Sequence, residues 1–227
     1  MKIKYSAISK TGKRRNNEDA FHVIDIPQEN RLICIVCDGM GGHACGEVAS
    51  ETVCYVLSSY WEEHTDIVDC ETKVKMACKK ASLSLDEKAD ALGHIEMGTT
   101  MVMASIKNDI ATIAHIGDSR CYLQRSNEGM VYQTKNHIRL DFGWEVVAKC
   151  FFAFHPEVAE PEVKQFRLEK GDRILLCTDG LYKSMRPSIL QTQMMENKSL
   201  NEILDAFSTL CEKQGDDNYT AVLIEVL

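Results

Sequence analysis

The hydrophobic pattern of the chain is dominated by apolar runs that stop or start at an aspartate. Three runs, rich in β-branched, aliphatic and cysteine residues, end at an aspartate, and a fourth begins just after one. The aspartates are Asp38, Asp118, Asp179 and Asp217. Runs of this length that break at Asp-Gly, Gly-Asp or Asp-Asn pairs predict buried strands with turns attached. We therefore expect the four carboxylates to gather at the rim of a sheet.

The remaining periodicity divides the chain into blocks of strands with helices between them. Strands are predicted at 3–9, 21–26, 32–37, 99–105, 110–116, 120–125, 130–134, 163–168, 173–178 and 219–226. Helices are predicted at 46–59, 72–91, 187–196 and 200–214. This order indicates an α+β fold with two stacked, mostly antiparallel sheets flanked by helices (an α-β-β-α sandwich), and not a doubly wound parallel sheet.

An aromatic-rich segment at 142–154 fits this pattern poorly. It crowds five large apolar side chains between polar residues: Phe142, Trp144, Phe151, Phe152 and Phe154. Either a core helix or a hydrophobic flap would explain the crowding, and we favour the core helix.

Length and composition limit the class of protein. With 227 residues, 44% of them hydrophobic, the chain can form one sizeable core, and we expect a single domain over residues 1–227. No stretch approaches the ~18 uninterrupted apolar residues of a membrane span, and the N-terminus lacks the apolar core of a signal peptide. We expect a cytoplasmic protein without membrane contact. The net charge of −8 argues against nucleic acid as a partner.

Ten cysteines raise the question of disulfides or of a cysteine metal site. Most lie within apolar runs, where a cytoplasmic protein uses cysteine as a small hydrophobic residue. Cys34 and Cys37 form a C-x-x-C pair. Residues three apart on a strand face opposite sides, which argues against a shared metal or redox site.

The four aspartates have two readings. A single Asp-Gly pair after a strand is ordinary turn chemistry. Four such pairs beside apolar runs are harder to explain in this way, because an uncompensated carboxylate at a core is strongly unfavourable. A bound cation is one compensation. Donors that are all oxygen suit magnesium or manganese better than zinc, which prefers histidine or cysteine.

The basic residues cluster at 10–15, directly before the polar and acidic residues 16–19. Such a cluster is usually a solvated loop. The alternative is that a guanidinium beside a metal site grips a phosphoester through two parallel hydrogen bonds.

Six motifs, in this order along the chain, resemble those of a known family. They are Gly12-x-Arg14-x-x-Asn17-Glu18-Asp19, Asp38-Gly39-Met40-Gly41-Gly42-His43, Gly98-Thr99-Thr100, Gly117-Asp118-Ser119-Arg120, Cys177-Thr178-Asp179-Gly180-Leu181 and Asp216-Asp217-Asn218-Tyr219-Thr220. Each motif alone is weak, but the combination spans nearly the whole chain and is specific. The sequence resembles the metal-dependent serine/threonine protein phosphatases of type 2C (the PPM family), and in particular their bacterial branch.

The resemblance implies two Mn²⁺ or Mg²⁺ ions per chain at one edge of the stacked sheets. The implied metal-holding residues are Asp38, which would bridge both ions, Asp179 and Asp217 on one ion, the Gly39 carbonyl and Glu18 on the other, and Asp19 in support. Arg14 matches the position that binds the substrate phosphate.

The implied reaction is hydrolysis of phosphoserine or phosphothreonine by a metal-bridged hydroxide that attacks phosphorus in line, without a phospho-enzyme. Arg14 and the metals would neutralise charge on the equatorial oxygens. Some members carry a histidine directly after the first Asp-Gly, but this chain has Met40. The proton donor to the leaving alkoxide is therefore a metal-bound water or His43, and for His43 we favour a loop or helix-entry role. The Thr99-Thr100 pair is expected to pack or hydrogen-bond near the aspartates.

Two departures from the family pattern affect the expected activity. Asp118 matches a residue that holds a third, weaker metal in bacterial members, but Lys183 replaces the aspartate that the family usually supplies beside it. A third ion is therefore doubtful, and the ammonium would take its place beside Asp118. The family's flap is not recognisable at 138–162, which predicts a shortened flap and weak discrimination among phosphoesters.

Three functions fit these observations. The favoured one is a protein serine/threonine phosphatase, monomeric, that acts on phosphorylated proteins and opposes a serine/threonine kinase. A second is a catalytically weak or inactive relative that binds a phosphoprotein as a regulator. A third is a hydrolase of small phosphoesters.

Overall fold

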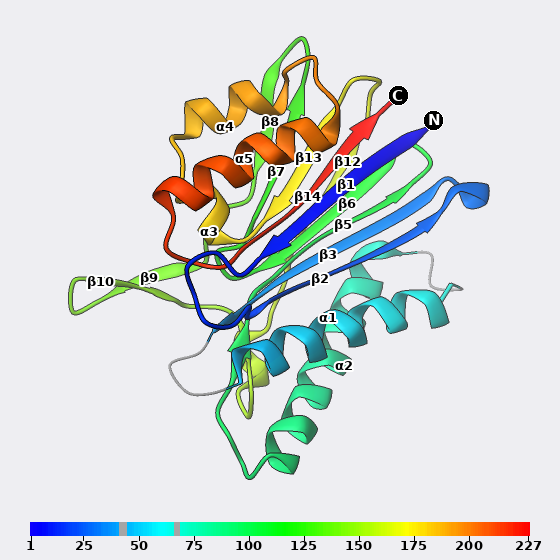
Figure 1. The fold of residues 1–227 in the computed structure, drawn as a ribbon. Coiled ribbons are helices and arrows are strands. Elements are labelled where there is room, and N and C mark those ends of the chain that lie inside the picture. Colours follow the sequence, from blue (N-terminus) through cyan, green and yellow to red (C-terminus); the bar gives the residue numbers. More distant parts are fainter. Residues whose placement is uncertain (41–44, 66–68) are drawn as a thin grey trace.

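The computed structural model describes residues 1–40, 45–65 and 69–227. Within them, two β-sheets stack face to face and helices cover both outer faces (Figure 1). Every pairing between the described strands is antiparallel. The predicted α-β-β-α sandwich is confirmed.

In each of the two large sheets, the spatial order of the strands differs from their order along the chain. The first sheet has the order β1 (Ile3–Lys10), β14 (Tyr219–Val226), β13 (Arg173–Cys177), β7 (Arg120–Arg125) and β8 (Gly129–Gln133). The second has the order β11 (Phe151–Phe152), β4 (Gly98–Thr99), β3 (Arg31–Met40), β5 (Met101–Lys107), β6 (Ile110–Ile116) and β12 (Glu162–Arg167), with β2 (Asp19–Ile26) also paired to β3.

The helices form the two outer layers. Helices α1 (Gly46–Glu63) and α2 (Cys70–Ala91) cover the second sheet, whereas α3 (Asp179–Tyr182), α4 (Pro187–Met194) and α5 (Leu200–Gln214) cover the first (Figure 1). Short 3₁₀ turns lie at η1 (Pro27–Glu29) and η2 (Pro156–Val158). Helix α5 begins at a capping box, in which the Ser199 side chain accepts from the Glu202 N–H and the Glu202 carboxylate accepts from the Ser199 N–H.

The sequence of strand β3 is apolar from Leu32 to Cys37 because both faces of the strand are buried. One set of its side chains faces the other sheet and the alternate set faces α1 and α2: Leu32, Cys34 and Val36 against Ile33, Ile35 and Cys37. Both faces are buried, so both registers of the strand must be hydrophobic. The two cysteines of the C-x-x-C pair lie in different cores, as predicted.

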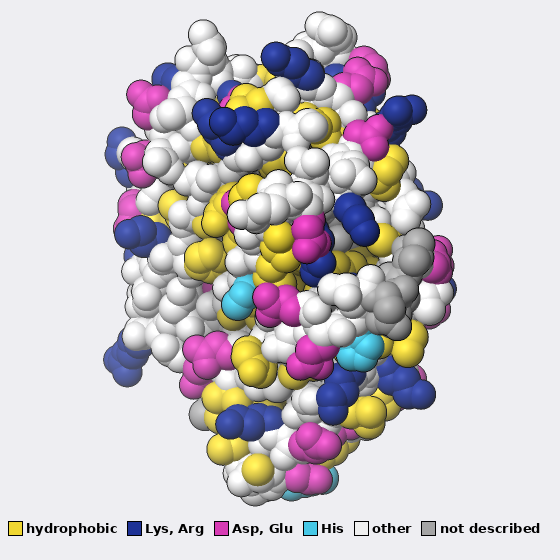
Figure 2. Space-filling model, turned by 90° about the vertical axis from the view of Figure 1, so that its right-hand side faces the viewer, with side chains coloured by type: hydrophobic (Ala, Val, Ile, Leu, Met, Phe, Trp, Pro, Cys, Tyr) yellow, Lys and Arg dark blue, Asp and Glu magenta, His cyan; other side chains and the backbone are white. Residues whose placement is uncertain are grey.

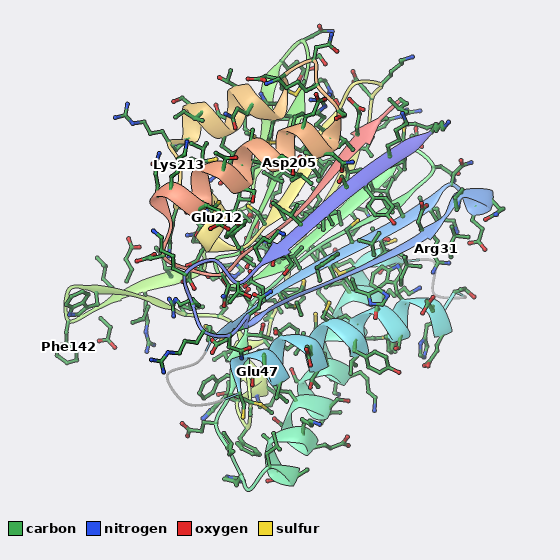
Figure 3. All side chains as sticks on the ribbon, in the orientation of Figure 1. Arg31, Glu47, Phe142, Asp205, Glu212 and Lys213 are labelled. Carbon is green, nitrogen blue, oxygen red and sulfur yellow. The ribbon has the colours of Figure 1, made fainter. Side chains whose placement is uncertain are left out.

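The segment after β8 departs from the expected core helix. Residues Ile138–Asp141 (β9) and Trp144–Val147 (β10) form a two-stranded hairpin that projects from the body of the protein (Figure 1). Its two-residue loop, Phe142 and Gly143, has φ values of 47° and 86°, the left-handed conformation that tight hairpin turns need. Phe142 is 99% exposed at the tip and points away from the sheets (Figure 3).

The prediction of a core helix was therefore wrong, and residues 138–147 form the alternative, a hydrophobic flap. Only the end of the segment is core, as a strand instead of a helix. There, Phe151 of β11 pairs with Thr99 of β4 and is fully buried.

The surface is mixed in charge where it can be seen. On the face shown in Figure 2, Lys and Arg side chains are interspersed with Asp and Glu, as on an ordinary solvated surface. Among the described residues, no helix has the length and apolar character needed to span a membrane.

Candidate metal centre

The aspartates at the strand ends come together from both sheets. Asp38, near the end of β3, pairs in register with Asp19, the first residue of β2. Asp118 lies in the turn between β6 and β7, Asp179 opens α3 directly after β13, and Asp217 precedes β14. The two sheets thus present carboxylates to one another at a shared edge, and the charges of the other four aspartates all act on Asp38.

Because these aspartates lie close together and are partly buried, ionising their carboxyl groups is energetically unfavourable. Burial, and then repulsion by the other aspartates, holds the pKa of Asp38 well above its ordinary value. Burial raises the pKa of Asp19 to about 7, although hydrogen bonds from Thr220 and Thr178 oppose the shift. The pKa of Asp118 is raised as well, by burial and by Asp179. A cation at this edge would relieve the cost of ionising all of them.

The backbone of Asp38 is fixed by the two threonines of the Gly98-Thr99-Thr100 motif. The Thr99 hydroxyl donates to the Asp38 carbonyl at 2.8 Å, and the Thr100 N–H donates to the same oxygen at 2.9 Å. The Asp38 N–H donates to the Thr100 hydroxyl at 3.1 Å. The pair therefore hydrogen-bonds at the aspartates, as expected.

Gly39 is a glycine because backbone surrounds it. A Cβ at this position would lie 2.2 Å from the Gly46 carbonyl oxygen and 2.6 Å from the Glu18 carbonyl oxygen. The Gly39 N–H donates to that Glu18 oxygen at 3.0 Å. The contact brings Glu18 beside the end of β3, next to Asp38.

Two residues that organise the site had no role assigned from sequence. Asn218 accepts from the Glu18 N–H at 2.9 Å and donates to the carbonyls of Thr11 and Asn16 at 2.8 Å each. Thr178 donates to Asp19 at 2.9 Å. Both lie inside the quoted motifs, each next to a metal-ligand candidate, and this adjacency is the signal that could have identified them.

Two basic side chains reach the carboxylates. Arg14 is 56% exposed in the loop between β1 and β2; its Nη2 donates to Asp217 at 2.9 Å and its Nε donates to the Asp216 carbonyl at 3.1 Å. Lys183 Nζ lies 2.6 Å from Asp179 Oδ2 and 3.9 Å from Asp118 Oδ2. The ammonium thus stands between two aspartates, beside Asp118 as its sequence position indicated. His43 lies outside the described residues.

The donor set fits hard divalent cations. The side-chain donors are carboxylates from β2, β3 and α3, from the turn between β6 and β7, and from the loops before β2 and β14. Oxygen donors, partly accessible and mutually repelling, match the preference of Mg²⁺ and Mn²⁺. Cations bound there would take the place of protons that the raised pKa values would otherwise retain.

Comparison with known proteins decides the family. The sequence matches the family described as Protein phosphatase 2C over residues 9–227. The chain belongs to this family. The resemblance read from the six motifs is confirmed, and the relatives described next are bacterial.

Among relatives of this family member, the serine/threonine phosphatase stp of Listeria welshimeri is 31% identical over 93% of this chain and 91% of its own length. The serine/threonine protein phosphatase PstP of Mycobacterium tuberculosis is 28% identical over 99% of this chain and 45% of its own length.

Solved structures agree in fold. The catalytic domain of PstP, solved in complex with two manganese ions, has a TM-score of 0.82 and 26% identity over 99% of this chain and 98% of that one. The serine/threonine phosphatase of S. agalactiae has a TM-score of 0.86 at 24% identity, covering 100% of both chains.

The raised pKa values predict how the metal-free phosphatase responds to pH. A carboxyl group whose pKa is higher folded than unfolded binds more protons in the folded state. The bound proton stabilises the folded state fully below pH ~4, the ordinary pKa of the group. This stabilisation is lost as the pH rises through the pKa of the folded state, which is about 7 for Asp19. The stabilisation by added Mn²⁺ should therefore grow between pH 5 and pH 8.

The measurement is the melting temperature with Mn²⁺ and with chelator at each pH. The difference between the two should widen by several degrees across this range. A difference that stays constant would contradict the charge repulsion inferred here.

Proposed function

We propose that this protein is a metal-dependent phosphatase that hydrolyses phosphoserine and phosphothreonine in proteins. The observation that carries the proposal is the convergence of aspartates from both sheets, with Arg14 beside them. A protein without a cation to bind would have no physical reason to hold carboxylates whose pKa values are raised by one another. Residues 1–227 would form the single phosphatase domain.

Each carboxylate has a distinct place in the proposed centre. Two ions, Mn²⁺ or Mg²⁺, would be held by Asp38 between them, by Asp179 and Asp217 on one side, and by Glu18 and the Gly39 carbonyl on the other, with Asp19 in support. When bound, such ions would lower the pKa of a water molecule and place positive charge on the phosphoryl oxygens. The two manganese ions in the complex of PstP support the proposed number of ions.

Arg14 would orient the substrate. Its guanidinium now pairs with Asp217, but Asp217 bound to a cation would need this partner less. Arg14 is half exposed and would be free to turn toward a phosphate. Its planar donors can take two phosphoryl oxygens at once and neutralise the charge that builds on them.

The leaving serine or threonine alkoxide must receive a proton. His43 stays a predicted candidate, since the described residues do not include it, and a water molecule is the alternative. We further propose that the enzyme is a cytoplasmic monomer, and that its phosphoprotein substrates are products of an opposing serine/threonine kinase.

The test is phosphate release from a phosphothreonine peptide with Mn²⁺, with Mg²⁺ and with chelator. A small aryl phosphate, compared by kcat/KM, tests the alternative of a small-phosphoester hydrolase. We expect release that needs metal and that favours the peptide. A metal-loaded, folded protein that releases nothing from either substrate would favour the non-catalytic phosphoprotein-binding function.

A separate prediction concerns Lys183 and the number of metal ions bound per chain. Its ammonium lies within ion-pair distance of Asp118 and Asp179, so it places one positive charge where a third cation would otherwise be needed. Lys183→Asp removes that charge and adds a donor. We expect one additional Mn²⁺ per chain by native mass spectrometry or calorimetry, and an activity that requires at least several-fold more Mn²⁺.

Lys183→Gln is the matched control, because it removes the charge without supplying a carboxylate. It should raise the metal requirement without adding a bound ion. An unchanged stoichiometry and titration for Lys183→Asp would show that Lys183 has no part in the centre.

A further inference from the structure

A second group of side chains of metal-ligating types differs from the aspartates, because it offers nitrogen as well as oxygen donors. His115 on β6, His137 just before β9 and Glu162 at the start of β12 place one ligand atom each within 4.8 Å of one another. His115 is 1% exposed, whereas the side chains of His137 and Glu162 are 13% and 40% exposed. The group is thus anchored in the core at one end and open to solvent at the other.

The hydrogen bonds of His115 leave one ring nitrogen available. Its Nε2 lies 2.9 Å from the Lys135 carbonyl oxygen. A carbonyl can only accept, so Nε2 carries the proton and Nδ1 carries a lone pair. Among the described residues, this buried Nδ1 has no hydrogen-bond partner. An imidazole that donates one N–H to a backbone carbonyl and keeps the other nitrogen free is the arrangement typical of a metal-ligating histidine.

Both imidazoles are neutral at physiological pH. Burial lowers the pKa of His115, with Lys149 adding to the shift and Glu162 opposing it. Burial and the neighbouring His115 lower the pKa of His137 to about 4. The two rings stack with centroids 4.4 Å apart. Histidine binds metal in its neutral form, so the pair does not first have to lose a proton from a charged ring.

We propose that His115, His137 and Glu162 form a site for a transition-metal ion of the zinc class, separate from the carboxylate centre. Two imidazoles and one carboxylate make up the mixed nitrogen and oxygen set that Zn²⁺ accepts, with a fourth position for water. Mg²⁺ prefers oxygen donors alone. The two sites therefore select different metals.

Binding requires the ring proton of His137 to change from one nitrogen to the other. Its Nδ1 accepts from the Gly117 N–H at 3.2 Å, so Nε2, which lies 3.8 Å from Glu162, carries the ring proton. Coordination through Nε2 needs the other neutral tautomer, in which the single ring proton has moved from Nε2 to Nδ1 by exchange with solvent, so no net proton is released and the long Gly117 hydrogen bond is lost. Because the two stacked rings lie within 14° of parallel and each lone pair lies in its ring plane, the His137 ring must also rotate, and the three ligand atoms must draw together to metal–ligand distances of about 2.0–2.2 Å.

The site would fasten the exposed hairpin to the second sheet. The His137 carbonyl accepts from the Ala148 N–H at 2.7 Å, across the base of β9 and β10, and its N–H donates to the Gly117 carbonyl at 2.9 Å, next to Asp118. An ion shared with β6 and β12 would hold the base of the hairpin in place.

The test is calorimetric titration of the whole protein with Zn²⁺ in excess Mg²⁺, which fills the carboxylate centre. We expect one equivalent to bind, and Co²⁺ in its place to give the intense visible absorption of a nitrogen-ligated ion. His137→Gln and Glu162→Gln should each weaken Zn²⁺ binding at least tenfold. The wild type should also gain thermal stability from Zn²⁺, and the two variants should gain much less.

The exposed pair His155, just before η2, and Glu157, within it, lie 3.2 Å apart and supply the matched control. His155→Gln should bind Zn²⁺ as the wild type does. Circular dichroism establishes that each variant is folded, and repeating the titration in Asp38→Asn tests for Zn²⁺ at the aspartates. If no Zn²⁺ binds in excess Mg²⁺, or if folded Glu162→Gln and His137→Gln bind it unchanged, the histidines are a packed structural pair and the proposal fails.

Discussion

Asp38→Asn should reduce phosphate release from a phosphothreonine peptide by at least about a thousandfold, a loss of roughly 4 kcal/mol in transition-state stabilisation. The other aspartates all act on Asp38, which makes it the centre of the carboxylate group. An amide keeps the shape of the side chain but removes the charge that would hold two cations. The loss should persist at saturating peptide and at high Mn²⁺, because no concentration of metal restores the bridging carboxylate.

The same substitution should stabilise the metal-free protein. Ionised Asp38 is repelled by the other aspartates, and its burial is unfavourable, so a neutral isostere removes an unfavourable charge. We expect the melting temperature in chelator at pH 7.5 to rise by a few degrees, and the stabilisation by Mn²⁺ to shrink.

Asp205→Asn, on the exposed face of α5 (Figure 3), is the control for a generic loss of negative charge. It should leave both activity and the response to Mn²⁺ unchanged. If Asp38→Asn were active, or if it destabilised the metal-free protein, the centre would not be organised around this carboxylate.

The strands and their aspartates could be predicted because burial on both faces leaves a strong sequence signal. Both faces of strand β3 are buried, so its apolar run continues until Asp38, near the end of the strand. The turn residues that follow such runs carry the chemistry. The sheet edge and the site were therefore visible in the same pattern.

The hairpin at 138–147 could not be predicted in this way. Its aromatic residues normally indicate a core, but Phe142 and Trp144 are 99% and 77% exposed, and hydrophobicity alone does not distinguish a buried helix from a projecting flap. The deciding signal was local: Phe142-Gly143 forms a two-residue turn between residues that pair across it.

The roles of Asn218 and Thr178 were hidden for a different reason. Each acts through hydrogen bonds to segments far away in the sequence, about 200 residues for Asn218 and Glu18 and 159 for Thr178 and Asp19. Such contacts depend on how the two sheets stack, which spacing along the chain does not report. Motif position marked these residues as part of the site without indicating what they touch.

The carboxylate centre and the histidine group illustrate how donor type separates two neighbouring sites. Gly117 links them, since its N–H reaches His137 and the next residue is Asp118. The aspartates are all-oxygen and repel one another, so they favour a hard cation that neutralises several charges at once. The histidines are neutral and need no such compensation. A metal that suits one group is therefore a poor match for the other.

Arg14→Ala should lower kcat/KM for the phosphothreonine peptide by about 10–100-fold, which corresponds to roughly 1.4–2.7 kcal/mol. The guanidinium supplies fixed donors for the phosphate, and without them the substrate keeps only its contacts with the metals. We expect the larger part of the loss in KM. Arg14→Lys should recover only part of it, because an ammonium keeps the charge but loses the planar pair of donors.

Metal binding should distinguish this role from a structural one. Arg14 pairs with Asp217 in the described structure, so its removal frees a carboxylate and should leave Mn²⁺ affinity unchanged or higher. Arg15→Ala, at the exposed neighbouring position, is the control and should change neither quantity. Calorimetry with Mn²⁺ and steady-state kinetics on the same samples separate the outcomes. A weakened Mn²⁺ affinity in Arg14→Ala, or an unchanged kcat/KM, would show that Arg14 holds the loop between β1 and β2 and does not bind the phosphate.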